Sequence, residues 1–102
     1  MARRVGPPVI LLAEDDIVFA APDSFEIDLV AGARVSLFPM VPITGTSTGL
    51  RWPIDNIALD PMGMVGTSNQ ATGPVRLDFD QPGCLVILSR KELATALDAL
   101  RG

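Results

Sequence analysis

The residues of this sequence that best suit ligand binding lie in one stretch, Thr44–Ile54, which reads TGTSTGLRWPI. It places the single tryptophan, Trp52, after a run of hydroxyl-bearing residues and glycines. A small aromatic ligand needs a flat ring to stack on and a few polar groups that fix its orientation, and this stretch offers both. The alternative is structural: the glycine-rich segment leads into a strand, and Trp52 fills the protein core. Residue types alone leave both interpretations open.

A second polar stretch, Gly66–Asn69, reads GTSN. The Asn69 amide carries a donor and an acceptor, which complements a ring nitrogen beside an exocyclic amine. Ser68 precedes it, and the hydroxyls of Ser47 and Thr48 in the first stretch could contact the same ligand. The alternative is again structural, because Ser and Asn are common residues at turns.

Composition excludes several other kinds of site. The 102 residues include no histidine, which excludes His-based catalytic triads and His-containing zinc sites. Gly45–Gly49 is not followed by Gly-Lys-Ser/Thr, so it is not a Walker phosphate loop. The three acids of Glu14–Asp16 are typical of a solvated turn rather than a magnesium site. We therefore expect no catalytic residue, metal site or cofactor in this chain.

Charge and hydropathy limit the partners and the location of the protein. A net charge of −4 argues against nucleic-acid binding, which needs clustered Lys and Arg. The longest purely apolar run, Val9–Ala13, is too short to span a bilayer, and the acids that follow it argue against a signal peptide. The single cysteine, Cys84, cannot form an internal disulfide. We expect a cytoplasmic protein with no nucleic-acid or membrane partner.

Short alternating segments between glycines and prolines predict the elements that must position these residues. The predicted strands are Val9–Ala13, Ile17–Ala21, Phe25–Leu29, Arg34–Phe38, two segments within Ile43–Ile54, Met64–Thr67, Val75–Phe79 and Cys84–Leu88. Predicted turns lie at Asp60–Gly63 and Asp80–Gly83, and a polar loop at Asn69–Pro74. We expect an all-β fold, a jelly-roll-like β-sandwich of two antiparallel sheets with about eight or nine strands.

The end of the chain predicts a different element. Ser89–Glu92 has the pattern of a capping box, and apolar residues then recur at helical spacing up to Leu100. Gly102 stands where a helix C-cap would. A short amphipathic helix within residues 89–102 is therefore predicted to pack on a sandwich formed by residues 1–88, within a single domain.

Three blocks resemble, in order and approximate spacing, the signature of the C-terminal domain of thiamin pyrophosphokinase. They are VSLFPM at Val35–Met40, TGTSTGLRWPI at Thr44–Ile54 and GTSN at Gly66–Asn69. The resemblance implies a β-sandwich that binds thiamin and forms homodimers. In this family a separate N-terminal α/β domain holds ATP, magnesium and the catalytic aspartates, and the resemblance implies that this half lies outside the present chain.

The family resemblance also implies an activity and a set of roles. The intact thiamin diphosphokinase transfers a pyrophosphoryl group from ATP to thiamin, and this piece alone is expected to be inactive. Trp52 matches the position whose ring stacks on the aminopyrimidine of thiamin, contributed across the dimer interface. Ser68 and Asn69 match the third block, while Ser47 and Thr48 precede the Gly-Leu of the second, where the loop is shorter than in the bacterial motif. The C-terminal helix departs from the family pattern. A rival interpretation is a non-catalytic β-sandwich that serves as an interaction module or binds a carbohydrate through Trp52.

Overall fold

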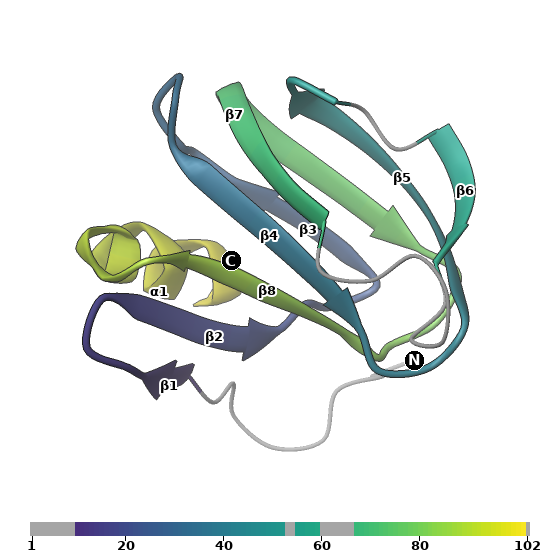
Figure 1. Ribbon diagram of the computed structural model, residues 1–102, viewed down its shortest axis with the longest axis horizontal. Helices are drawn as coiled ribbons and strands as arrows, with labels where there is room; N and C mark the ends of the chain where they lie inside the picture. The colour runs from purple at the N-terminus through teal and green to yellow at the C-terminus, as the bar shows by residue number, and fades with distance from the viewer. Residues whose placement is uncertain (1–9, 53–54, 60–66, 102) are drawn as a thin grey trace.

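Eight strands, a 3₁₀ turn and a short α-helix make up the regular structure of the described residues. The computed structural model describes residues 10–52, 55–59 and 67–101, which Figure 1 shows as coloured ribbon. The strands are β1 (Ile10–Leu12), β2 (Asp16–Ala20), β3 (Ser24–Ile27), β4 (Arg34–Pro39), β5 (Ile43–Leu50), β6 (Asp55–Leu59), β7 (Thr67–Phe79) and β8 (Cys84–Ser89). A 3₁₀ turn, η1 (Arg90–Glu92), and the helix α1 (Leu93–Arg101) follow. The predicted all-β class with a short C-terminal helix is confirmed. The predicted turn at 60–63 and residues 64–66 of a predicted strand lie outside the described residues.

The strands form one continuous, curled antiparallel sheet (Figure 1). Its order is β1-β2-β8-β4-β7-β5-β6, with β3 pairing to β7. The long strand β7 joins the two halves, because its first residues pair with β4 and its last residues pair with β3 and β5. The predicted antiparallel pairing is confirmed, and the two sheets expected from the sequence are connected through β7.

The prediction of a polar loop over Asn69–Pro74 is wrong, because this segment belongs to β7. Asn69 and Ala71 are buried and Gln70 between them is exposed, so the alternation of a strand continues through the segment. A buried asparagine conceals that alternation in the sequence. Proline has no N–H to donate to a neighbouring strand. Pro74 is tolerated in β7 because it lies at an irregularity in the register with β5, where the regular ladder of hydrogen bonds is interrupted.

Gly49 allows β5 to approach β7 closely at the same irregularity. Its φ is +85°, and a Cβ placed on it would lie 2.0 Å from the carbonyl oxygen of Pro74. Only glycine tolerates both the positive φ and the close backbone contact. Gly49, the second glycine of the Thr44–Ile54 block, therefore shapes the strand that leads directly to Trp52.

Apolar side chains on the inner face of the curled sheet form the core. The alternation predicted for Phe25–Leu29 and Val75–Phe79 is confirmed, since every second residue in each segment is buried. The rings of Phe19 and Phe25 pack with centroids 5.5 Å apart and planes inclined at 58°. The predicted central position of Cys84–Leu88 is also confirmed, because β8 lies between β2 and β4.

The start of the C-terminal helix differs from the predicted capping box. Ser89 is extended, and its side chain makes no capping hydrogen bond. Instead, the connection between β1 and β2 holds η1: the Arg90 N–H donates to the Asp15 carbonyl at 2.8 Å, and the Arg90 guanidinium donates to the Ala13 carbonyl at 3.1 Å. A tertiary contact therefore takes the place of the local cap.

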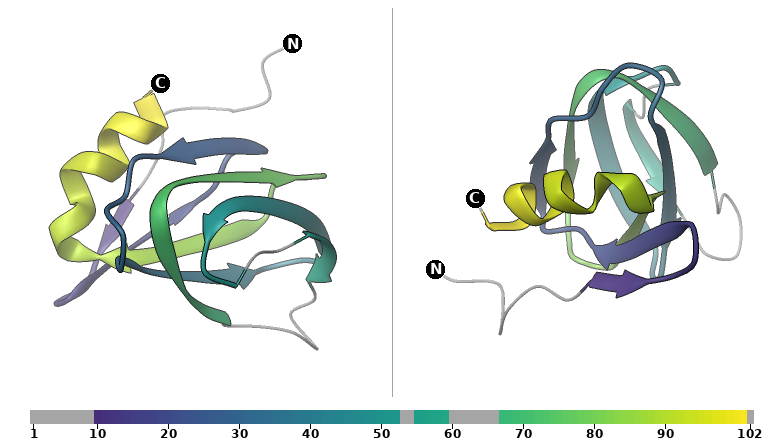
Figure 2. Two further views of the ribbon diagram at one scale, coloured as in Figure 1. Left: turned by 90° about the horizontal axis from the view of Figure 1, so that it is seen from above. Right: turned by 90° about the vertical axis from the view of Figure 1, so that its left-hand side faces the viewer.

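The helix α1 lies against β3 and closes the side of the curled sheet near β2 and β3 (Figure 2). Ala96 and Leu100 are buried in the core, whereas Leu97 is exposed. Within the described residues, neither helical segment has the length and apolar character needed to cross a membrane. The predicted C-cap, Gly102, lies outside the described residues.

Candidate functional site

The indole of Trp52 lies at the surface, immediately beyond the end of β5. The residue is 54% exposed, so its ring does not fill the core. The backbone pairing of β5 with β7 continues past the strand end, because the Arg51 N–H donates to the Gln70 carbonyl at 2.8 Å. The structural interpretation is therefore wrong in placing Trp52 in the core, although the glycine-rich segment does form a strand, β5. The exposed ring is available for stacking.

A buried amide holds the backbone of Trp52. Asn69 is only 4% exposed, and its Oδ1 accepts hydrogen bonds from the Trp52 N–H at 3.1 Å and the Gln70 N–H at 2.9 Å. Its Nδ2 donates to the Trp52 carbonyl at 2.7 Å. The acceptor capacity of Oδ1 is thus filled by the protein, and among the described residues Nδ2 uses one of its two hydrogens. Asn69 therefore positions the exposed ring by fixing its backbone on both sides.

Arg51 is a residue of this site that sequence reasoning missed. Its guanidinium carbon lies 4.9 Å from the centroid of the Trp52 ring, within the range of a cation–π contact. The guanidinium also donates to the Gln70 side-chain oxygen at 3.4 Å. The signal in the sequence was a cation directly preceding the only tryptophan. One face of the indole is consequently partnered by a positive charge.

The remaining predicted site residues do not all gather around Trp52. Ser68 precedes Asn69 on β7, in register with Ser36 of β4. Ser47 is half-buried and pairs with the buried Leu77, which places it on the inner face of the sheet, the face that Asn69 also shares. Thr48 is exposed and pairs with Arg76 on the outer face. Because consecutive strand residues point to opposite faces, Ser47 and Thr48 cannot both contact one small ligand on one face of the sheet.

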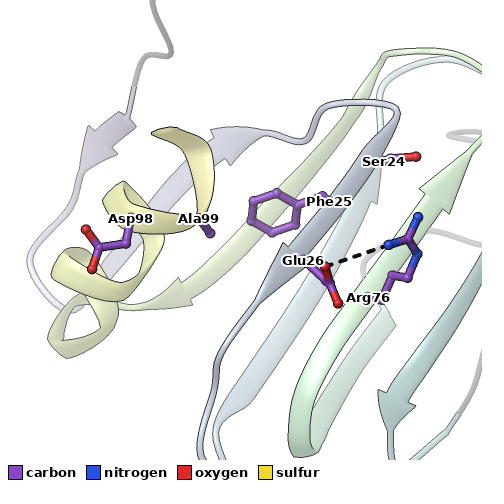
Figure 3. A pocket seen from close by; sticks show the side chains of 6 residues that line it. All are labelled: Ser24, Phe25, Glu26, Arg76, Asp98 and Ala99. Carbon is purple, nitrogen blue, oxygen red and sulfur yellow. Dashed lines mark ion pairs between the residues drawn. The ribbon is translucent and has the colours of Figure 1, made fainter. Parts of the chain in front are cut away.

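An open hollow of about 370 Å³ lies between α1, β3 and β7, away from the Trp52 site (Figure 3). Its polar lining is largely paired: Arg76 donates to Asp78 at 2.9 Å and lies 3.7 Å from Glu26, while the Ser24 hydroxyl donates to Asp78 at 2.8 Å. The hydrogen bond from Arg76, followed by that from Ser24, lowers the pKa of the Asp78 carboxyl. None of the residues predicted from the sequence lines this hollow.

Metal ligation finds no support in the described side chains. Among them, no three His, Cys, Asp or Glu residues lie close enough together to hold an ion. Cys84 is buried, and burial raises the pKa of its thiol to about 11, which leaves it protonated and unreactive near neutral pH. The arrangement around Trp52 suits binding, because an exposed ring offers a surface for stacking beside the polar groups of Asn69 and Gln70.

Comparison with known proteins identifies relatives of this fold and sequence. The family model described as thiamin pyrophosphokinase, vitamin B1 binding domain, matches residues 24–84, more than half of the chain. A search of curated proteins found no match.

Solved structures of similar fold include three thiamin pyrophosphokinases. The enzyme from Candida albicans is 19% identical with a TM-score of 0.70, over 80% of this chain and 33% of that one. The enzyme from Bacillus subtilis is 17% identical with a TM-score of 0.69, over 80% and 41%. The enzyme from Geobacillus thermodenitrificans is 18% identical with a TM-score of 0.65, over 78% and 39%. At these identities the likeness establishes the shared fold, and the matched region spans about a third to two-fifths of each relative. Taken with the family match over residues 24–84, it confirms the resemblance seen in the three sequence blocks: this chain belongs to the thiamin pyrophosphokinase family, as a thiamin-binding domain.

Proposed function

We propose that the domain binds thiamin with its aminopyrimidine ring stacked on Trp52, and that it orients the thiamin hydroxyl to attack ATP, which yields thiamin diphosphate and AMP. The observation that carries this proposal is the exposed indole on a backbone held by the buried Asn69 amide. A platform that is already fixed before the ligand arrives loses little conformational freedom on binding. Stacking contributes about 0.5–1.5 kcal/mol beyond the burial of area, so polar contacts must add to it.

The polar contacts are assigned to residues of β5 and β7 that the sequence predicted. Ser68 is adjacent to Asn69 on β7 and carries a hydroxyl, and Asn69 has one amide hydrogen beyond its bond to the described Trp52 carbonyl. Ser47 shares the inner face of the sheet with Asn69, which favours it over Thr48 on the outer face. These groups would fix the orientation of the aminopyrimidine, while Trp52 supplies most of the contact area.

Magnesium and ATP belong, in this proposal, to another part of the intact enzyme. Pyrophosphoryl transfer needs carboxylates that hold a divalent cation against the phosphates. The described side chains offer no such cluster, so we derive no metal step through this domain. The 102-residue chain supplied with thiamin, ATP and Mg²⁺ should form no thiamin diphosphate; product above the level of a protein-free control would refute this division of roles.

Intrinsic fluorescence offers a direct test of thiamin binding. Trp52 is the only tryptophan and the chain has no tyrosine, so the emission reports on that ring. Thiamin should quench or shift it, whereas glucose should not. By calorimetry, Trp52→Leu should bind thiamin at least about tenfold more weakly, while Leu97→Ala on the exposed face of α1 should bind normally. Equal affinity in Trp52→Leu would refute the assignment, and a response to sugar without one to thiamin would favour a carbohydrate-binding module.

We also propose that the domain forms a homodimer through the outer face of β1, β2, β8 and β4. The strand registers place five apolar residues on this face, and each is half-buried or exposed: Leu11, Val18, Phe38, Leu85 and Ile87. Contact between two copies would remove this apolar surface from water. In sedimentation, Leu85→Lys should yield monomers and Leu97→Lys should not; a persistent Leu85→Lys dimer would refute this interface. If thiamin binds across two subunits, its binding should also weaken on dilution below the dimer dissociation range.

A further inference from the structure

The positive charge beside the exposed indole is the feature that leads beyond thiamin binding itself. Arg51 is held near the ring at two points. Its backbone N–H donates to the Gln70 carbonyl, and its guanidinium contacts the Gln70 side chain. Its guanidinium carbon lies 4.9 Å from the Trp52 centroid. Among carboxylates whose side chains the structure describes, none forms an ion pair with Arg51. The charge over the ring is therefore not neutralised by these groups.

A cation over an aromatic face uses the negative electrostatic potential of that face. A second cation that stacks on the opposite face of the same ring lies only several ångströms from a like charge, which repels it. An uncharged ring meets no such repulsion, because stacking depends on contact area and the ring quadrupole. A guanidinium at this position therefore discriminates between rings by their charge.

We propose that Arg51 is a specificity-determining residue that makes the Trp52 platform select uncharged rings over cationic ones. This inference rests on the proposed function. Thiamin has a neutral aminopyrimidine at one end and a cationic thiazolium at the other, so a charge-selective platform takes the pyrimidine end. Arg51 thus sets the direction in which the two-ended ligand lies across the site.

A first experiment tests charge selectivity without any use of thiamin. Trp52 emission is quenched with the cation 1-methylnicotinamide, neutral acrylamide and the iodide anion, in the wild type, Arg51→Gln and Lys91→Gln. Lys91 is an exposed residue of η1, so its variant matches the change in net charge. Arg51→Gln should raise quenching by the cation about threefold and lower quenching by iodide, with acrylamide nearly unchanged, and Lys91→Gln should resemble the wild type. An equal rise for all three quenchers would show that Arg51 only shields the ring sterically, and no change would show that its charge is not felt there; either result overturns the proposal.

A second experiment measures the two halves of the ligand separately. The probes are 4-amino-5-hydroxymethyl-2-methylpyrimidine, which is uncharged near neutral pH, and a 3-methylthiazolium salt. Arg51→Gln should strengthen thiazolium binding about five- to tenfold and change pyrimidine binding less than about twofold. Parallel changes for both probes would overturn the proposal. If the wild type fails to bind thiamin at all, the proposed function fails, and the quenching experiment still decides the role of Arg51.

Discussion

Replacement of Asn69 by alanine tests whether a buried amide holds the exposed ring in place. The change removes two hydrogen bonds to the Trp52 backbone, at 3.1 and 2.7 Å, and a third from the Gln70 N–H at 2.9 Å. Each such bond contributes about 0.5–1.5 kcal/mol net to stability. Because Trp52 lies at the surface, water replaces part of the lost bonding, and we expect the free energy of unfolding to fall by about 2–3 kcal/mol. In a domain of this size that corresponds to a melting temperature lower by about 10–20 °C.

Urea unfolding followed by far-UV circular dichroism measures this loss without relying on the indole. In the folded variant, Trp52 emission should also shift to the red and its anisotropy should fall, because the ring gains freedom. Gln70→Ala is the matched control: it alters the exposed neighbour, whose side chain accepts a long, 3.4 Å contact from Arg51, and should change stability by less than about 0.5 kcal/mol.

An aspartate at position 69 has the same shape as asparagine and tests the donor role of Nδ2 separately from the acceptor role of Oδ1. Asn69→Asp keeps the accepting oxygen but turns a carboxylate oxygen toward the Trp52 carbonyl, where Nδ2 now donates. Its stability deficit relative to the wild type should shrink as the pH falls, since a protonated carboxyl again supplies a donor. If Asn69→Ala lost less than about 0.5 kcal/mol with unchanged anisotropy, Trp52 would have to be held by other contacts and the reasoning would be refuted.

Three further predictions concern the rest of the molecule. Gly49→Ala should lower the free energy of unfolding in urea by at least about 3 kcal/mol, and Gly32→Ala by only about 1–2 kcal/mol. Both glycines have positive φ, but of the two only a Cβ at Gly49 would meet a backbone oxygen. Equal losses of stability would contradict this. Arg76 lowers the pKa of Asp78, so above the usual pKa of Asp the wild type should be more stable to urea than Asp78→Asn. This difference in stability should disappear as the pH falls through the lower folded-state pKa, and a difference independent of pH would contradict the prediction. Burial raises the pKa of Cys84 from 9.0 to about 11, so native alkylation by iodoacetamide at pH 8 should be at least about 100-fold slower than in urea, and similar rates would contradict this.

Local patterns in the sequence predicted most of the strands, because their inward-facing residues are apolar and alternate, as in Phe25–Leu29. The sequence also singled out Trp52, although its exposure became clear only in the structure. The errors arose where a polar residue has a distant partner. Asn69 is buried in a strand because its amide bonds to a residue 17 positions away, and Arg90 begins the helix through a contact 77 positions away. Spacing along the chain reports neither contact.

The sharing of β7 between both halves of the sheet has a consequence for how the molecule loses its structure. Loss of β7 would remove a pairing partner from β3, β4 and β5 at the same time. Neither half of the sheet can therefore unfold while the other half stays folded. Denaturation should be all-or-none, and the amide protons of β7 should be among the last to exchange with deuterium. Asn69 sits on this strand. The backbone that carries Trp52 therefore draws its rigidity, through Asn69, from a strand that pairs with three others.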